Sequence, residues 1–215
     1  MEILKPSHEE ASIVIEKSSH IDWTQVKVVS WDVDGTLYDM KGMIRHMRFL
    51  IVRLIFKGHW SILWRVLSAL RRHLRFVKSI RKQQGVLATH THVNPWNHPD
   101  HDLWLHQLLF PAIQRTGIHP RVIKYTQFFS AMGFDQVIVS DFKSHQKLDM
   151  LGLAHTFTSH FAGEEIGYLK PSTQLFEHVC HQLAINPSEL LHIGDKESCD
   201  GQAARAAGCQ VIIVP

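Results

Sequence analysis

Two aspartates separated by one residue follow the first strongly apolar segment of the chain. The apolar residues 26–31 lead directly into Asp32-Val33-Asp34-Gly35. Because side chains alternate along a strand, Asp32 and Asp34 point the same way, and the glycine lets the backbone turn sharply after them. This spacing is typical of a carboxylate nucleophile beside a general acid or base. A merely polar turn is the alternative interpretation, since Asp and Gly are common turn residues.

Carboxylates also follow a second apolar segment near the C-terminus. Residues 190–193 run into Asp195, and Asp200 lies five positions further along. If the two strands are parallel, their carboxyl ends meet at the sheet edge where ligands bind in open α/β sheets. Clustered acids repel one another, and a cation relieves that repulsion. The pattern therefore predicts a divalent metal site at this edge.

A hydroxyl and an ammonium occur between these acidic segments. The expected strand 136–141 contains Ser140 near its end, and Lys170 precedes a helix start at Pro171. A hydroxyl and a cation beside a metal suit the spread negative charge of a phosphoryl group. The order along the chain is nucleophile, hydroxyl, lysine and metal acids.

Alternating strand and helix patterns predict an α/β fold, with a doubly wound (Rossmann-like) parallel sheet. Gly152 and Gly208 follow expected helix ends, as C-terminal glycines commonly do. The remaining expected strands are 156–161 and 210–214. The expected helices are 41–84, 102–116, 121–132, 144–151, 172–183 and 198–207.

These segments together resemble the haloacid dehalogenase-like (HAD) hydrolase superfamily. Its four motifs correspond, in order, to residues 32–39, Ser140, Lys170-Pro171, and Gly194-Asp195 with Asp200. The resemblance covers residues 24–40 and 119–215, and the four-part combination is much more specific than any single motif. It implies a catalytic core over residues 1–40 and 117–215, with an all-helical cap inserted at residues 41–116.

The resemblance implies a role for each motif residue. Asp32 would be the nucleophile that forms an aspartyl-phosphate, and Asp34 the acid that protonates the leaving oxygen and later activates water. Ser140 and Lys170 would hold the phosphoryl oxygens. An aspartate at position 34 favours the phosphatase branch over dehalogenation, which needs no leaving-group protonation.

The cofactor implied is Mg²⁺. Asp32, the backbone carbonyl of Asp34 and Asp195 would hold it, with Asp200 as a further ligand or a support for the others. The implied activity is hydrolysis of a small phosphorylated metabolite, a phosphate monoester. A phosphotransferase or phosphomutase would share these motifs. A different alternative is a protein of the same fold that has no catalytic activity and binds anionic lipid or nucleic acid through its cap.

One position departs from the family pattern. Many relatives have Asn after the hydroxyl of the second motif, whereas this chain has Asp141. An added negative charge near a phosphate site would repel substrate, unless Asp141 turns away or pairs with Lys143. Substrate preference therefore cannot be taken over from better-known relatives.

The expected cap is strongly basic. Residues 40–99 contain no Asp or Glu but twelve Lys and Arg, leaving 11 basic and 20 acidic residues elsewhere. The basic residues could form a solvated helix face, attract an anionic substrate, or place residues 41–82 on a membrane surface or nucleic acid. Charges interrupt every apolar run, so no membrane-spanning segment is expected. Helical spacing predicts mostly cap core for Met47, Leu50, Leu54, Ile62, Leu63, Val66, Leu67, Leu70, Leu74 and Val77.

Histidine and cysteine usage favours a cytoplasmic protein without a zinc site. Cys180, Cys199 and Cys209 form no C-x-x-C pair and indicate reduced thiols with buried structural roles. No secretory signal is evident in residues 1–22. Six histidines gather between residues 90 and 119, but no cysteine joins them and this His-rich loop lacks firm zinc geometry. We expect instead that His92 or His101 lines the substrate pocket.

Overall fold

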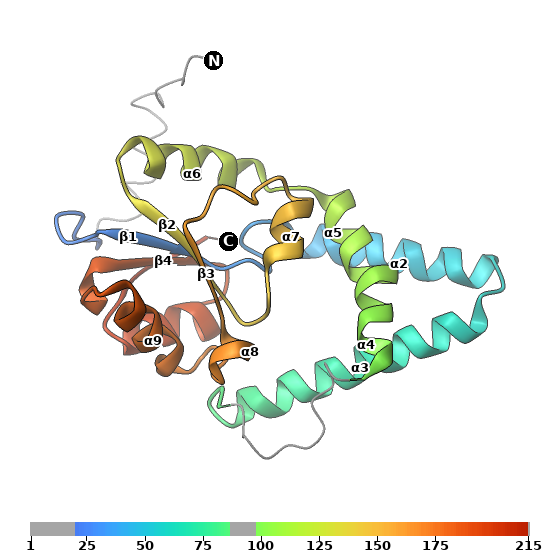
Figure 1. The fold of residues 1–215 in the computed structure, drawn as a ribbon. Coiled ribbons are helices and arrows are strands. Elements are labelled where there is room, and N and C mark those ends of the chain that lie inside the picture. The colour runs from blue at the N-terminus through green and yellow to red at the C-terminus, as the bar shows by residue number, and fades with distance from the viewer. Residues whose placement is uncertain (1–19, 87–97, 215) are drawn as a thin grey trace.

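The computed structural model describes residues 20–86 and 98–214, and its core is a five-stranded parallel sheet (Figure 1). The strands are β1 Val28–Trp31, β2 Asp135–Ser140, β3 Ser159–Ala162, β4 Leu190–Gly194 and β5 Gln210–Ile213. Their order in the sheet is β3-β2-β1-β4-β5, and every pair is parallel. The α/β prediction is confirmed.

Alternating side chains of the strands build two apolar layers, one on each face of the sheet. Val29 and Trp31 pack with helices α6 (Pro120–Ala131) and α7 (His145–Met150), whereas Val28 packs with α9 (Thr173–Leu183) and α10 (Gln202–Ala206). Helices cover both faces of a parallel sheet, so the side chains on each face must be apolar enough to pack against them. Short elements complete this part: α8 Gly163–Ile166, η3 Pro187–Glu189 and the π-helical turn η4 Glu197–Gly201.

The strand register places the chemistry at one edge. Trp31, the last residue of β1, pairs with Ile138 of β2 and Ile193 of β4. The next residue, Asp32, donates its backbone N–H to the Ile193 carbonyl at 2.8 Å. The residues that follow all three strands therefore emerge together at the carboxyl edge of the sheet.

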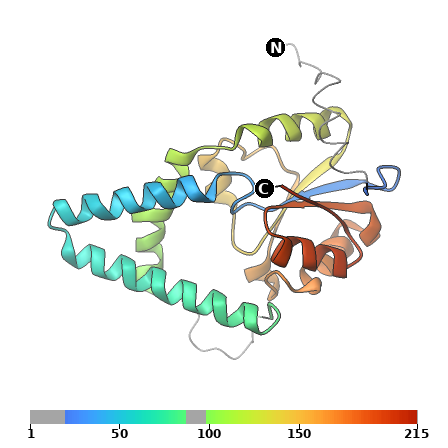
Figure 2. The same ribbon diagram turned by 180° about the vertical axis from the view of Figure 1, so that it is seen from behind.

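The helices between β1 and α6 form a separate layer beyond this edge (Figures 1 and 2). They are α2 Met40–Phe56, α3 Trp60–Lys82, α4 Pro99–Trp104, η2 Leu105–Leu109 and α5 Phe110–Thr116. Asp39 caps α2 by accepting the N–H groups of Lys41 and Gly42. Residues 41–116 remain our proposed cap insertion.

One expectation for this layer is wrong. The single helix expected over residues 41–84 is a hairpin, broken at 57–59, where Gly58 has a φ of 69°. Most of the apolar residues expected in the cap core do pack there, and Leu67 and Leu74 are the exceptions, because both are exposed. The cap core centres on Val66, Ala69, Trp104 and Leu108.

The end of α3 reaches the core domain near Lys170. The Leu169 N–H donates to the Gly85 carbonyl at 2.7 Å, and Val86 forms an isolated antiparallel bridge with Tyr168. This contact joins the cap to the segment that carries the predicted phosphate-binding lysine. None of the described helices is long and apolar enough to cross a lipid bilayer.

Candidate active site

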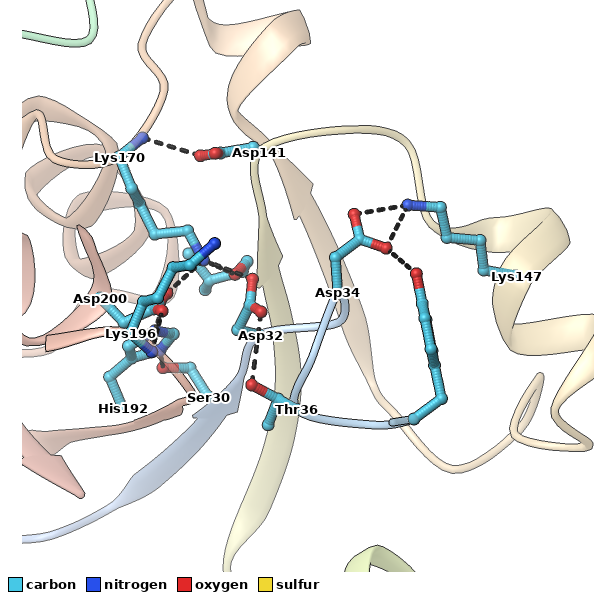
Figure 3. A network of polar contacts seen from close by, with 12 residues as sticks. Ser30, Asp32, Asp34, Thr36, Asp141, Lys147, Lys170, His192, Lys196 and Asp200 are labelled. Atoms are coloured by element: carbon cyan, nitrogen blue, oxygen red, sulfur yellow. Dashed lines mark hydrogen bonds and ion pairs between the residues drawn. The ribbon is translucent and has the colours of Figure 1, made fainter. Parts of the chain in front are cut away.

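The carboxyl edge of the sheet brings the predicted site residues together, and Figure 3 shows Asp32, Lys170 and Asp200 among them. Asp32 follows β1, Ser140 ends β2, and Asp195 follows β4. Asp200 lies in η4, and Lys170 lies in the segment before α9. All of them line one cavity. Segments separated by more than 100 residues thus meet at the position that the strand pattern predicts.

Three carboxylates form a cluster suited to a divalent cation. Asp32, Asp195 and Asp200 each offer an oxygen, and these oxygens lie within 4.8 Å of one another. Burial raises the pKa of Asp32 to about 7, with repulsion from Asp200 and Asp34 adding to it and Lys170 opposing it. Hard carboxylate oxygens at this spacing fit Mg²⁺. The Asp34 carboxylate is not part of the cluster.

Lys170 bridges two of these acids. Its Nζ lies 2.5 Å from Asp32 Oδ1 and 2.5 Å from Asp200 Oδ1. Burial alone would lower the pKa of Lys170, but Asp32, Asp200 and Asp141 outweigh burial and raise it. The ammonium therefore stays charged, and it holds the nucleophile candidate in a fixed position.

A buried histidine extends this network into the sheet. His192 Nε2 lies 3.3 Å from Asp200 Oδ1, and its Nδ1 lies 2.9 Å from Ser30 Oγ. A carboxylate only accepts, so Nε2 carries the hydrogen and Nδ1 accepts from the serine hydroxyl. Burial lowers the pKa of His192 despite the neighbouring carboxylate. The neutral His192 ring therefore orients the Asp200 carboxylate through this hydrogen bond.

Asp34 has a partner that sequence reasoning missed. Lys147 Nζ of α7 lies 2.6 Å from both Asp34 oxygens (Figure 3). The Tyr38 hydroxyl also donates to Asp34. Burial would raise the pKa of Asp34, but Lys147 outweighs it and lowers the pKa. No local pattern marks Lys147, because its burial depends on how α7 packs beside β1.

Two hydroxyl groups, of Ser140 and Thr36, also belong to the site. Ser140 Oγ is buried, and among the described residues it has no hydrogen-bond partner. An unpaired buried hydroxyl is costly, so its place at the cavity suits a ligand acceptor. Thr36 Oγ1 donates to Asp32 Oδ2 at 3.3 Å.

Asp141 is neutralised from the cap. Its Oδ2 lies 3.1 Å from Arg81 at the end of α3, and its Oδ1 accepts the Lys170 backbone N–H at 2.7 Å. The suggested pairing with Lys143 is wrong, because Lys143 bonds Glu165 at 3.1 Å instead. The negative charge of Asp141 is thus compensated by Arg81, which belongs to the helical layer beyond the sheet edge.

The cavity lies between the sheet edge and the cap and has a volume of about 1220 Å³. Its cap side includes His73, His101 and Trp104, and their rings contact one another. Phe142 of the core contacts His73 across the cavity, with ring centroids 5.1 Å apart. His101 thus lines the cavity as expected, whereas His92 lies outside the described residues.

The three cysteines follow the sequence prediction in part. Cys180 and Cys209 are buried, Cys199 is partly exposed, and none forms a disulfide within the described residues. Cys199 also lines the cavity.

Comparison with known proteins yields relatives in one superfamily. The model of the haloacid dehalogenase-like hydrolases matches residues 26–208. A phosphoglycolate phosphatase of Thiobacillus denitrificans is 33% identical over 109 residues, which cover 47% of this chain and 48% of that protein. A glyceraldehyde 3-phosphate phosphatase of Methanopyrus kandleri is 26% identical over 203 residues, covering 85% and 81%.

Solved structures share the fold. A 2-haloacid dehalogenase from Pseudomonas syringae superposes with a TM-score of 0.62 at 18% identity, covering 87% of this chain and 86% of that one. A HAD phosphatase from Thermococcus onnurineus gives a TM-score of 0.61 at 23% identity, covering 88% and 86%. With a family model that spans most of its length, the chain belongs to the haloacid dehalogenase-like hydrolases, as its motifs suggested.

Proposed function

We propose that this protein is a Mg²⁺-dependent phosphatase that hydrolyses a small phosphate monoester through an aspartyl-phosphate on Asp32. The observation that carries the proposal is the meeting of Asp32, Lys170 and the acidic cluster at one cavity. The phosphatases among its relatives support the same class of reaction.

The chain's own residues divide the chemistry. Asp32 attacks phosphorus and releases the alcohol oxygen, and Lys170 and Ser140 bind the phosphoryl oxygens. Asp34 transfers a proton to the leaving oxygen and then removes one from the attacking water. Bound to Asp32 and Asp195, with Asp200 in support, Mg²⁺ would neutralise phosphoryl charge.

Lys147 influences the protonation state of Asp34, on which both proton transfers depend. By lowering the pKa of Asp34 it favours the ionised carboxylate, which is the form needed to deprotonate water. The leaving-group step needs the protonated form, so proton uptake by Asp34 works against the Lys147 contact. The two steps therefore place opposite demands on one ion pair.

The test is a panel of phosphate esters that includes phosphoglycolate and glyceraldehyde 3-phosphate, assayed with Mg²⁺ and with a chelator. We expect Mg²⁺-dependent release of inorganic phosphate that Asp32→Asn abolishes. Isomerised or transferred product without free phosphate would instead assign a mutase or transferase. Full activity in Asp32→Asn would exclude our nucleophile.

A further inference from the structure

The helix α3 has two long faces with different surroundings. Its inner face contributes Leu63, Val66, Ala69 and Val77 to the interior. The residues of its other face, here called the outer stripe, are spaced three or four positions apart, so they lie along one side of the helix. The outer stripe consists of Trp60, Trp64, Leu67, Arg71, Leu74, Arg75 and Lys78. At 1.5 Å per residue, this stripe is about 27 Å long.

Large apolar side chains of this stripe are unusually exposed. Trp64 is 75% exposed, Trp60 62% and Leu74 59%. Phe56, at the end of the neighbouring helix α2, is 87% exposed. Contiguous exposed apolar groups of this size indicate a surface that binds a partner or a membrane. A shallow groove of about 280 Å³ runs along the same side, from Leu67 to Lys78.

Among the residues that the structure describes, the cations of the stripe have no acidic partner. Within residues 20–86 and 98–214, no carboxylate lies within 4.0 Å of Arg71, Arg75 or Lys78. By contrast, Arg65 and Arg72 both bond Asp100 of α4, at 2.8 and 3.5 Å. The charge of the stripe is therefore available to an anionic partner.

We propose that the outer stripe and Phe56 dock on an anionic lipid bilayer, with α3 lying in the plane of the interface. Tryptophan favours the headgroup level, apolar side chains enter the boundary below it, and Arg and Lys pair with lipid phosphates. Two copies of so basic a stripe would repel each other. Nucleic acid would satisfy the cations but leave Leu67 and Leu74 exposed.

The position of the stripe links docking to the cavity. The α2–α3 hairpin turn points away from the sheet (Figures 1 and 2). Leu74 and Lys78 line both the outer groove and the large cavity. Docking would therefore place the rim of the cavity at the membrane surface, whatever reaction the site performs.

The direct test is flotation of the purified full chain with vesicles. We expect binding to phosphatidylcholine vesicles that contain about one third phosphatidylglycerol, weakened by salt, and much weaker binding to pure phosphatidylcholine. No binding to the anionic vesicles, or equal binding to both compositions, would overturn the proposal. This readout is independent of phosphatase activity.

Apolar anchoring is tested with paired variants. Trp60→Ser with Trp64→Ser should weaken partitioning into anionic vesicles at least about tenfold. The matched control is Ile123→Ser with Met132→Ser, which removes two exposed apolar side chains, one on α6 and one directly after its end, and should leave binding unchanged. All four positions are exposed, so the fold should survive, as a thermal unfolding curve can verify. Equal loss in both pairs would overturn the anchoring role.

Charge is tested in the same way. Arg71→Gln with Arg75→Gln should weaken partitioning about 30-fold, since each surface cation contributes about one factor of five. Lys27→Gln with Arg205→Gln removes the same charge from the core domain and should have little effect. Two other results would overturn the proposal: a dimer that the tryptophan variants dissociate, or duplex DNA binding that exceeds vesicle binding and ignores the tryptophans.

Discussion

The ammonium of Lys147 lies 2.6 Å from both carboxylate oxygens of Asp34. This contact joins α7 to the loop after β1, and it is almost completely withdrawn from solvent on the lysine side. In our proposal Asp34 is the group that moves protons. The ion pair therefore provides a direct way to test that role through pH dependence.

Replacing Lys147 by Met should shift the alkaline limb of the kcat/KM profile to higher pH, because kcat/KM reports the step in which Asp34 protonates the leaving oxygen. The ammonium lowers the pKa of Asp34, so its removal lets burial raise that pKa, and the protonated form persists to higher pH. The value of kcat/KM at high pH should fall less than its value at low pH. Lys143→Met removes an exposed lysine paired with Glu165 and serves as the control. An unmoved limb in Lys147→Met would contradict the assignment of Asp34.

Replacing Arg81 by Gln should raise KM about tenfold with little change in kcat. The substitution leaves Asp141 without its cap partner, and the freed negative charge repels the substrate phosphate. The double variant Arg81→Gln with Asp141→Asn should recover most of the affinity, because Asn can still accept the Lys170 N–H. Steady-state kinetics of the three variants measures the coupling. If the double variant were no better than the single one, charge repulsion would not be the cause.

The stability of the protein should depend on His73 between about pH 4 and 6.5. Burial, with smaller contributions from His101 and Lys147, lowers the pKa of His73 to about 4. In this window the unfolded chain binds the proton and the folded chain does not, so stability falls as pH falls. The effect is at most about 3 kcal/mol. His73→Phe should flatten the dependence of unfolding free energy on pH, and an unchanged slope would contradict this role of His73.

Replacing Gly35 by Ala should raise the Mg²⁺ concentration needed for half-maximal activity. Gly35 has a φ of 104°, and a Cβ there would press on the Asp195 carboxylate. Gly152→Ala is the control, because Gly152 also has a positive φ but faces open space. Both variants should lose about 1 kcal/mol of stability from backbone strain. A change in Mg²⁺ dependence in both, or in neither, would argue against Asp195 as a ligand.

Local patterns determined the architecture well. The apolar segments at 26–31, 136–141 and 190–193 correspond to three adjacent strands, so the acids and hydroxyl that follow them reach one edge. Strand pairing converts a position in the sequence into a position in space with little freedom. The same logic predicts that Asp195 lies near Asp32, and the structure places both in one carboxylate cluster.

Helix surroundings were decided only by tertiary packing. The periodicity of α3 identified an amphipathic helix, but it assigned Leu67 and Leu74 to the core although they lie on the outer stripe. A helix with apolar residues on two sides carries no local signal for which side is buried. The hairpin break at Gly58 was missed for a related reason, since a single glycine inside a helical pattern is ambiguous.

The sequence by itself determined the parallel fold, the carboxyl-edge location of the site and the residue types that meet there. Only the tertiary structure decided which charges pair: Lys147 with Asp34, Arg81 with Asp141, and Lys170 with both Asp32 and Asp200. The physical reason is the separation along the chain of the residues that interact. The alternation of apolar side chains that marks a strand follows from near neighbours along the chain, whereas a buried ion pair depends on the rotation and distance of elements that are far apart in sequence.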